Sequence, residues 1–132
     1  MKRRKKTTEI IIHHSLSTFG SAKIIKKWHL ERGFADIGYH YVITKDGKLQ
    51  KGRDLELQGA HARGKNETSI GICLVGDFSK HPPDARQINT LLCLIRSLCF
   101  IYCKELKVNF HHKTCPGIMF ARAHFLRRLN NE

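Results

Sequence analysis

The chain has 132 residues, of which 41% are hydrophobic and 27% are charged. These values suit one globular domain with its own core and exclude a disordered chain, a membrane-spanning chain and a two-domain protein. Twenty-four Lys and Arg residues against eleven Asp and Glu residues give a net charge of +13, which predicts attraction to polyanions such as nucleic acid, anionic lipid or a phosphate-bearing bacterial wall.

The first eight residues form a basic arm ahead of a domain that we expect to span residues 9–132. The arm resembles the positively charged start of a signal peptide, but only three isoleucines follow before two histidines, so the apolar segment is missing. We therefore expect the protein to stay in the cytoplasm in which it is synthesised, without membrane insertion. The arm itself is expected to be a solvated tail.

A short apolar run at Glu9–His14 predicts a buried strand whose end opens into a site. Because side chains alternate along a strand, His13 and His14 should lie on opposite faces, and at most one of them can point at a given metal. Ser21 can cap the following helix, which should end just before Gly33.

The dipeptide Asp46-Gly47 lies between two strand-like runs and predicts a β-hairpin with arms at residues 37–44 and 49–52. By alternation, Tyr39 and Tyr41 in the first arm should share one face of the sheet.

The second half of the chain completes an alternating order of strands and helices. Asp84 and Gln87 form a capping box, and helical spacing of apolar residues continues to about Lys104. The remaining segments are a polar loop at residues 53–68, a central strand at Ser69–Gly76, a strand at Lys107–His111 and an amphipathic helix at Ile118–Leu129. This order predicts an α/β fold in which one mixed sheet has helices packed on its faces.

The segment His111–Gly117 holds two imidazoles and a thiol within five residues, followed by Pro-Gly. Imidazole nitrogen and thiolate sulfur are preferred donors for zinc, and a catalytic zinc takes three protein ligands and leaves one position to water. His13 or His14 can supply the third ligand. At about 3.3–3.6 Å per extended residue, the chain between His111 and Cys115 can bridge neighbouring ligand positions. The sequence therefore predicts a zinc hydrolase.

Five blocks of the chain, in this order, resemble the type 2 N-acetylmuramoyl-L-alanine amidases. They are Ile12-His13-His14-Ser15, Gly38-Tyr39-His40-Tyr41, Gly59–Gly64, Asn66–Ile72 and His111–Gly117. This family includes T7-like phage endolysins and is similar to the peptidoglycan recognition proteins. The resemblance runs from about Ile10 to about Leu129 and implies hydrolysis of the amide between the lactyl group of N-acetylmuramic acid and L-alanine in bacterial peptidoglycan.

The resemblance also implies a ligand set for Zn²⁺. His13 matches the first ligand, His111 the second and Cys115 the third. The connection between the second histidine and the cysteine is shorter than in most family members, which leaves His111 and His112 as alternatives. We favour His111 because it continues the preceding strand, and His13 over His14 because of its place in the family pattern.

Three further residues receive roles from the same resemblance. Tyr39 matches the tyrosine beside the zinc-bound water, and Lys113 matches the lysine that stabilises the transition state in the T7-like branch. His61 lies where the family loop approaches substrate, so we expect it to contact substrate. The implied mechanism is zinc-assisted attack of water on the amide carbonyl, with Tyr39 and Lys113 stabilising negative charge on the tetrahedral oxygen.

Three other classes of protein compete with this hypothesis. A nucleic-acid-binding protein is disfavoured because the basic residues are scattered and form no recognition helix or aromatic platform. A non-catalytic peptidoglycan-binding module would typically lack the cysteine ligand, and Cys115 is present. A cytoplasmic recycling amidase would typically carry glutamate at the position of Cys73. We expect a monomeric, phage-type endolysin that acts on the wall after release.

Overall fold

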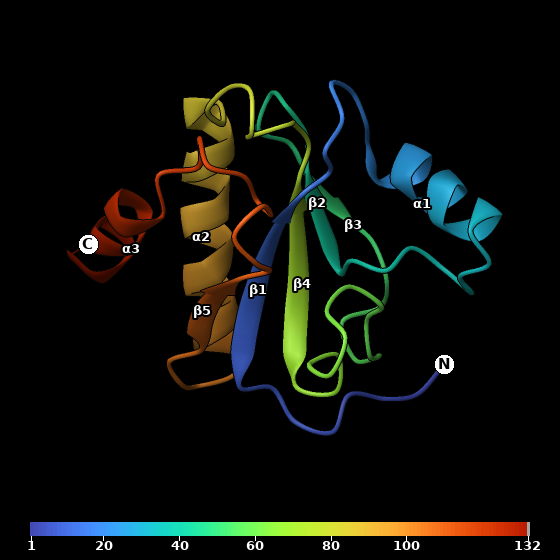
Figure 1. Ribbon diagram of the computed structural model, residues 1–132. Coiled ribbons are helices and arrows are strands. Elements are labelled where there is room, and N and C mark those ends of the chain that lie inside the picture. Colours follow the sequence, from blue (N-terminus) through green and yellow to red (C-terminus); the bar gives the residue numbers. More distant parts are fainter. Residues whose placement is uncertain (132) are drawn as a thin grey trace.

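The computed structural model describes residues 1–131, which form a five-stranded mixed sheet with helices on both faces (Figure 1). The elements are β1 (Glu9–His14), α1 (Ala22–Glu31), β2 (Tyr41–Ile43), β3 (Leu49–Lys51), β4 (Ser69–Leu74), α2 (Ala85–Ile101), β5 (Lys107–Phe110) and α3 (Arg122–Asn131). The strand order is β3-β2-β4-β1-β5, and only β3 runs antiparallel to its neighbour. The predicted fold class is confirmed.

Strand β1 lies between β4 and β5 and is parallel to both. Its register places His13 opposite Cys73 of β4 and Ile12 opposite Phe110 of β5. The His111 amide then donates to the Ile12 carbonyl at 3.1 Å. The carboxyl ends of these parallel strands therefore bring His13 and His111 to the same edge of the sheet.

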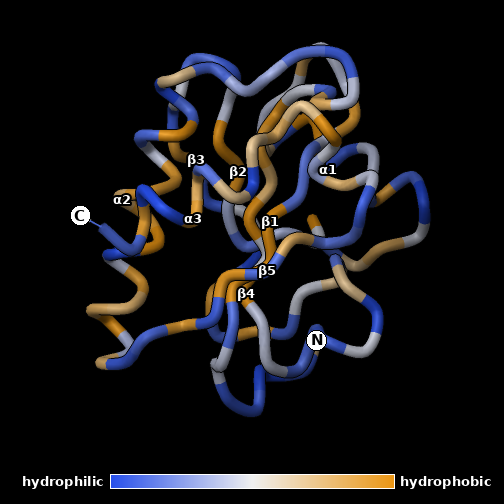
Figure 2. Tube along the Cα trace, turned by 60° about the vertical axis from the view of Figure 1, so that its left-hand side comes forward, coloured by the Kyte–Doolittle hydropathy of each residue, from blue (hydrophilic) through white to orange (hydrophobic). Residues whose placement is uncertain are grey.

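The larger core lies between the sheet and α2, with α3 at its margin (Figure 1). Its fully buried strand and helix residues include Ile10, Ile12, Ile70, Ile72, Leu74, Leu91 and Ile95. A smaller cluster under α1 covers part of the opposite face and contains Ile25, Ile37, Val42, Cys73 and Val75. Figure 2 shows the hydrophobic residues concentrated along the central strands.

Both predicted helix caps are present. The Ser21 side chain accepts from the Ile24 amide at 3.2 Å, and Asp84 forms a reciprocal capping box with Gln87. These bonds satisfy amide groups that the first helical turn leaves without partners. Helix α2 ends at Ile101, slightly before the expected residue.

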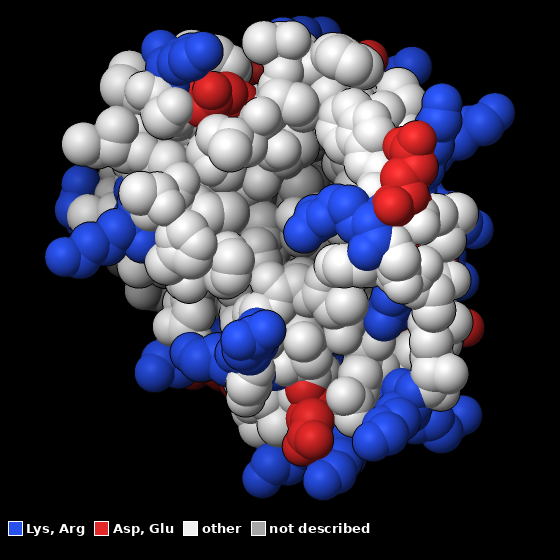
Figure 3. Space-filling model, turned by 45° about the vertical axis from the view of Figure 1, so that its right-hand side comes forward, with Lys and Arg blue, Asp and Glu red and all other residues white. Residues whose placement is uncertain are grey.

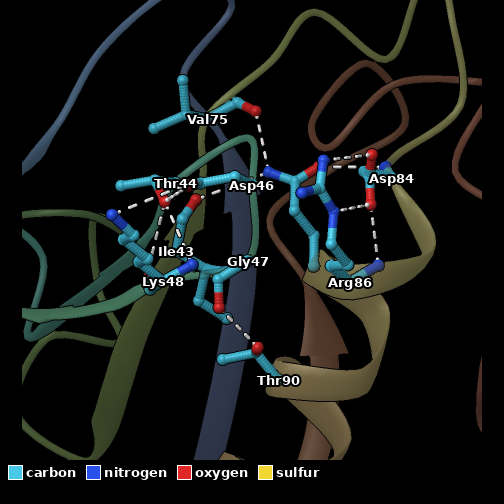
Figure 4. Close-up of polar contacts among 10 residues, drawn as sticks. Ile43, Thr44, Asp46, Gly47, Lys48, Val75, Asp84, Arg86 and Thr90 are labelled. Carbon is cyan, nitrogen blue, oxygen red and sulfur yellow. Dashed lines mark hydrogen bonds and ion pairs between the residues drawn. The ribbon is translucent and has the colours of Figure 1, made fainter.

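The hairpin turn docks on the first turns of α2 (Figure 4). The Thr44 amide donates to the Lys48 carbonyl at 2.9 Å, and the Thr90 hydroxyl donates to the Gly47 carbonyl at 2.6 Å. Gly47 has a φ of +87°, and a Cβ there would lie 2.7 Å from Cβ of Arg86. The predicted hairpin is confirmed, although its strands are shorter than expected.

The prediction that Tyr39 and Tyr41 share a face is wrong. Tyr41 begins β2 and packs against the core under α2, whereas Tyr39 packs against the cluster under α1. The alternation rule fails because the chain before Tyr41 is not part of the strand: the Gly38 amide donates to Nδ1 of His29 at 2.8 Å, and the Gly38 carbonyl accepts from Ala60 at 3.0 Å.

Helix α3 begins at Arg122, four residues later than the expected start at Ile118. The Met119 amide donates to the Phe78 carbonyl at 2.6 Å, and Phe120 is buried at 2% exposure. These tertiary contacts hold the segment in a non-helical path, which explains the late start.

The basic arm is not a solvated tail, so that expectation is wrong. Arg4 donates to the Tyr102 hydroxyl at 2.7 Å and to the Thr7 hydroxyl at 2.9 Å. The Arg4 amide donates to the Glu56 carbonyl at 2.8 Å, and Gln58 donates to the Lys2 carbonyl at 2.8 Å. The arm therefore packs along the loop that precedes β4. Within residues 1–131, no helix combines the length and apolar character needed to cross a membrane.

Candidate metal centre and cleft

Three of the predicted site residues meet at the carboxyl edge of the sheet. One donor atom each from His13, His111 and Cys115 lies within 4.8 Å of the other two. His13 is the next-to-last residue of β1, His111 follows β5, and their ring centroids are 4.5 Å apart. His13 is 1% exposed and Cys115 is 9% exposed, so this cluster lies at the base of the site rather than on the open surface.

A tight turn explains how three intervening residues are enough to return the thiol to the histidines. The His112 amide donates to the Cys115 carbonyl at 2.9 Å, and the Cys115 amide donates to the His112 carbonyl at 3.1 Å. The His14 amide donates to the Cys115 sulfur at 3.4 Å. His112 itself is exposed. Among the described residues, the donor cluster contains His111 and not His112.

The adjacent histidines of β1 point in opposite directions, as alternation predicts. Nδ1 of His14 accepts from the Phe78 amide at 3.0 Å, and the two rings are 5.7 Å apart. His13 faces the other side, where its ring contacts Tyr39 and His111.

Burial sets the protonation states of the cluster. It lowers the pKa of His13 well below its usual value, lowers the pKa of His111, and raises the pKa of Cys115 to about 11. At neutral pH the imidazoles are therefore unprotonated and can donate to a metal, while the thiol must release its proton on binding. Two imidazoles and one thiol form a donor set that fits Zn²⁺.

A cleft of about 500 Å³ opens over these three residues. Its other lining residues are His29, Arg32, Phe34, Tyr39, Ala60, His61, Ala62, Arg63, Gly64 and Asn66. Among the residues that the structure describes, no Asp or Glu lines this cleft, whereas two arginines do. Figure 3 shows a face with Lys and Arg spread around a hollow of uncharged residues. The cleft therefore favours a substrate that carries negative charge.

Tyr39 lies beside the donor cluster, with its ring centroid 5.0 Å from that of His13. Burial raises its pKa well above the usual value, and its side chain is hydrogen-bonded with Cys73. Tyr39 is therefore protonated at neutral pH and can act as a hydrogen-bond donor, but not as a base.

Lys113 does not line the cleft. Its side chain is exposed and borders a neighbouring cavity with Ile118 and Arg122. Arg122 donates to the Lys113 carbonyl at 3.0 Å, which fixes the backbone here and leaves the amine in solvent. The predicted catalytic role of Lys113 stays a prediction.

His61 lines the cleft, but both of its ring nitrogens are engaged by the protein. Nδ1 is 2.8 Å from Nε2 of His13, and Nε2 is 3.3 Å from the Ser69 hydroxyl. Neither contact was predicted from the sequence. The available signal was Gly71, in the middle of an apolar strand, where a Cβ would lie 2.6 Å from the His61 ring. The predicted substrate contact of His61 stays a prediction.

The loop that carries His61 is anchored by Asn66, a second residue whose role was missed. Its side-chain oxygen accepts from the amides of His61 and Ala62, each at 3.0 Å. Local side-chain acceptors of this kind fix a loop that lacks regular structure.

A mixed sheet with His, His and Cys donors clustered under an open cleft is an arrangement that could hold a metal ion beside a substrate. A family model described as N-acetylmuramoyl-L-alanine amidase matches residues 3–118, and the chain belongs to this family. It is 37% identical over 123 residues to the endolysin of Escherichia phage T7, covering 87% of this chain and 81% of the phage protein.

Solved structures show the same relationship. The N-acetylmuramoyl-L-alanine amidase LysC from Clostridium intestinale matches with a TM-score of 0.88 and 30% identity, covering 94% of this chain and 85% of LysC. Drosophila PGRP-LB matches with a TM-score of 0.79 and 29% identity, covering 92% of this chain and 85% of PGRP-LB. The predicted family, including its similarity to peptidoglycan recognition proteins, is confirmed.

Proposed function

We propose that the protein is a zinc-dependent N-acetylmuramoyl-L-alanine amidase that hydrolyses the amide between N-acetylmuramic acid and L-alanine in bacterial peptidoglycan. The observation that carries this proposal is the meeting of His13, His111 and Cys115 under the cleft of a chain that belongs to this family. Hydrolysis leaves a carboxyl group on the lactyl moiety and a free amine on L-alanine.

The place of each residue in the site determines its proposed role. His13, His111 and Cys115 would hold Zn²⁺, which when bound supplies a Lewis acid for water and for the amide carbonyl. Tyr39 donates a hydrogen bond to the oxygen of the former carbonyl as negative charge develops on it. Lys113, on the exposed loop, adds positive charge when substrate covers the site, and His61 lies along the bound substrate chain.

The relatives that are phage endolysins support a lytic role in the wall. In this proposal the protein is made in the host cytoplasm, acts as a monomer, and reaches peptidoglycan after a separate membrane lesion. It requires neither membrane insertion nor a specific nucleic acid. Co-expression with and without a membrane-disrupting partner tests this role. Lysis should need the partner, and lysis without it would contradict the proposal.

The activity itself is tested with purified protein and isolated walls. We expect soluble muropeptides to appear together with new amino groups, which labelling and hydrolysis should assign to alanine. A chelator should stop the release, and zinc should restore it. Cys115→Ser should be inactive.

The matched control is Cys103→Ser, which changes an exposed cysteine beyond the end of α2 and should release fragments at the wild-type rate. Walls that remain intact with one equivalent of zinc bound would overturn the enzymatic proposal and support a binding module. New termini on a residue other than alanine would overturn the assigned bond.

A further inference from the structure

We propose that His61 is a positioning residue that holds the ring of His13 so that only Nδ1 of His13 can bind the metal. The inference rests on the proposed zinc site. It differs from the substrate contact expected of His61 because it acts through the ligand rather than through the substrate.

The first step is the contact between the two rings. Nε2 of His13 and Nδ1 of His61 are 2.8 Å apart. In a neutral imidazole, one ring nitrogen carries a proton and the other carries a lone pair. Whichever of the two Nε2 of His13 carries, the hydrogen bond with His61 engages it. Nε2 of His13 is therefore unavailable to a metal, and Nδ1 is the nitrogen left free.

The direction of that hydrogen bond follows from Ser69. Its hydroxyl oxygen is 2.7 Å from the Lys65 carbonyl and 3.3 Å from Nε2 of His61. Because a carbonyl oxygen only accepts, the hydroxyl donates to Lys65 and its oxygen accepts from the Nε2–H of His61. Nδ1 of His61 then carries a lone pair and accepts from the Nε2–H of His13. The Lys65 carbonyl thus selects the tautomer of His61 and, through it, that of His13.

The surroundings of His61 are built for this arrangement. A Cβ at Gly59 or at Gly71 would lie 2.6 Å from the His61 ring, so both glycines make room for it against the sheet. Asn66 accepts from the His61 amide at 3.0 Å and fixes the backbone that carries the ring.

For the metal centre, this contact would fix the orientation of the His13 ring and make it a stronger ligand. A metal-binding histidine that donates its second N–H to a fixed acceptor holds one tautomer and is a more basic ligand. His13 is the ligand contributed by the interior strand β1, and its hydrogen bond with His61 sets its tautomer and orientation. No rearrangement of the ring is then needed on binding.

The tautomers can be measured directly by long-range ¹H–¹⁵N correlation NMR of ¹⁵N-labelled protein at pH 8. With and without zinc, we expect the proton of His13 and that of His61 on Nε2. A proton on Nδ1 of either residue would overturn the proposal. The zinc-free spectrum decides the question even if the protein binds no zinc, in which case the proposed function alone fails.

Two variants whose side chains both branch at Cγ separate the acceptor from the shape of the side chain. His61→Asn retains an oxygen near the position of Nδ1, whereas His61→Leu has no acceptor. We expect His61→Leu to weaken zinc affinity about 10–100-fold and His61→Asn to stay close to wild type, because loss of such a partner typically costs this much. Affinity is measured by competition with a chromophoric chelator.

His124→Leu, on exposed α3, is the matched control and should bind zinc like the wild type. Thermal unfolding of each zinc-free variant separates loss of fold from loss of metal. Equal zinc affinity for the Asn and Leu variants of His61, whether weak or strong, would show that the acceptor is irrelevant and would overturn the proposal.

Discussion

The two faces of the sheet are equally buried along β1 but serve different purposes. Ile12 is 0% exposed and packs under α2, while its neighbour His13 is 1% exposed and faces the cleft. On the first face, the cluster around Ile12 is built mainly of apolar side chains. On the second face, the buried ring of His13 is held by a hydrogen bond between its Nε2 and His61.

Strand β4 shows what makes the second face possible. Ile70, Ile72 and Leu74 fill the core under α2, whereas Gly71 on the opposite face leaves space for the His61 ring. Among the described residues, no buried side-chain polar atom lacks a partner. One face therefore provides stability through packing, and the other pays for its polar site with complete hydrogen bonding.

The largest difference should appear when each of the two histidines of β1 is replaced by alanine in turn. His13→Ala should abolish zinc binding and amidase activity with little loss of fold, because it removes a donor from the cluster. His14→Ala should keep one equivalent of zinc but lower the free energy of unfolding by about 1–3 kcal/mol, because the buried Phe78 amide loses its acceptor. Zinc titration and urea unfolding of both variants check this, and equal zinc loss in both would contradict it.

The two tyrosines give a second contrast. Tyr39→Phe should lower kcat about 10²–10³-fold, because it removes a hydrogen bond to the developing oxyanion, while zinc affinity stays unchanged. Tyr41→Phe, on the face under α2, should leave kcat at the wild-type value. Steady-state kinetics on a soluble muropeptide measures both, and unchanged kcat in Tyr39→Phe would remove Tyr39 from the mechanism.

A substitution on the face under α2 should change the stability of the protein and nothing else. Ile95→Ala removes a fully buried side chain of α2 and should cost about 2–5 kcal/mol of unfolding free energy. Zinc affinity of the folded variant should be unchanged. A large fall in zinc affinity at a temperature where the variant is fully folded would show that the two faces are coupled.

The smallest effect concerns pH. His40 accepts from the Gly71 amide and its other nitrogen bonds with the Leu57 carbonyl, so the fold needs the neutral ring. Burial lowers the pKa of His40 to about 4, below the value of about 6.5 in an unfolded chain. The stabilisation is complete above about pH 6.5 and is lost as the pH falls toward 4, with a slope of about 1 kcal/mol per pH unit.

Urea unfolding of the zinc-free protein between pH 7.5 and 4.5 measures that slope. His40→Asn can still accept from Gly71 but does not titrate, so its slope should be shallower. An unchanged slope would show that other groups carry the pH dependence.

The local elements were predictable from sequence because local chemistry determines them. The alternation of Glu9–His14, the Ser21 cap and the Asp84 capping box each depend on residues within one or two turns. The ordered family blocks led to the family and to the residues of the donor cluster, and the short connection to Cys115 proved to be a closed turn.

The missed features depend on contacts between distant segments. Arg4 reaches Tyr102 across 98 positions, and Met119 is held by Phe78, so neither the docked arm nor the late start of α3 follows from a local pattern. The bond between His13 and His61 spans 48 positions. Periodicity carries no information on such pairs, since they arise only when the fold brings distant segments together.

The position of β5 at the edge of the sheet also bears on how the protein matures. His13 belongs to the first strand, but His111 and Cys115 arrive only after β5 has paired with β1. A nascent chain therefore has an incomplete donor cluster until nearly all of it has emerged from the ribosome. Any metal uptake at this cluster in a refolding reaction should then report the closing of the sheet edge.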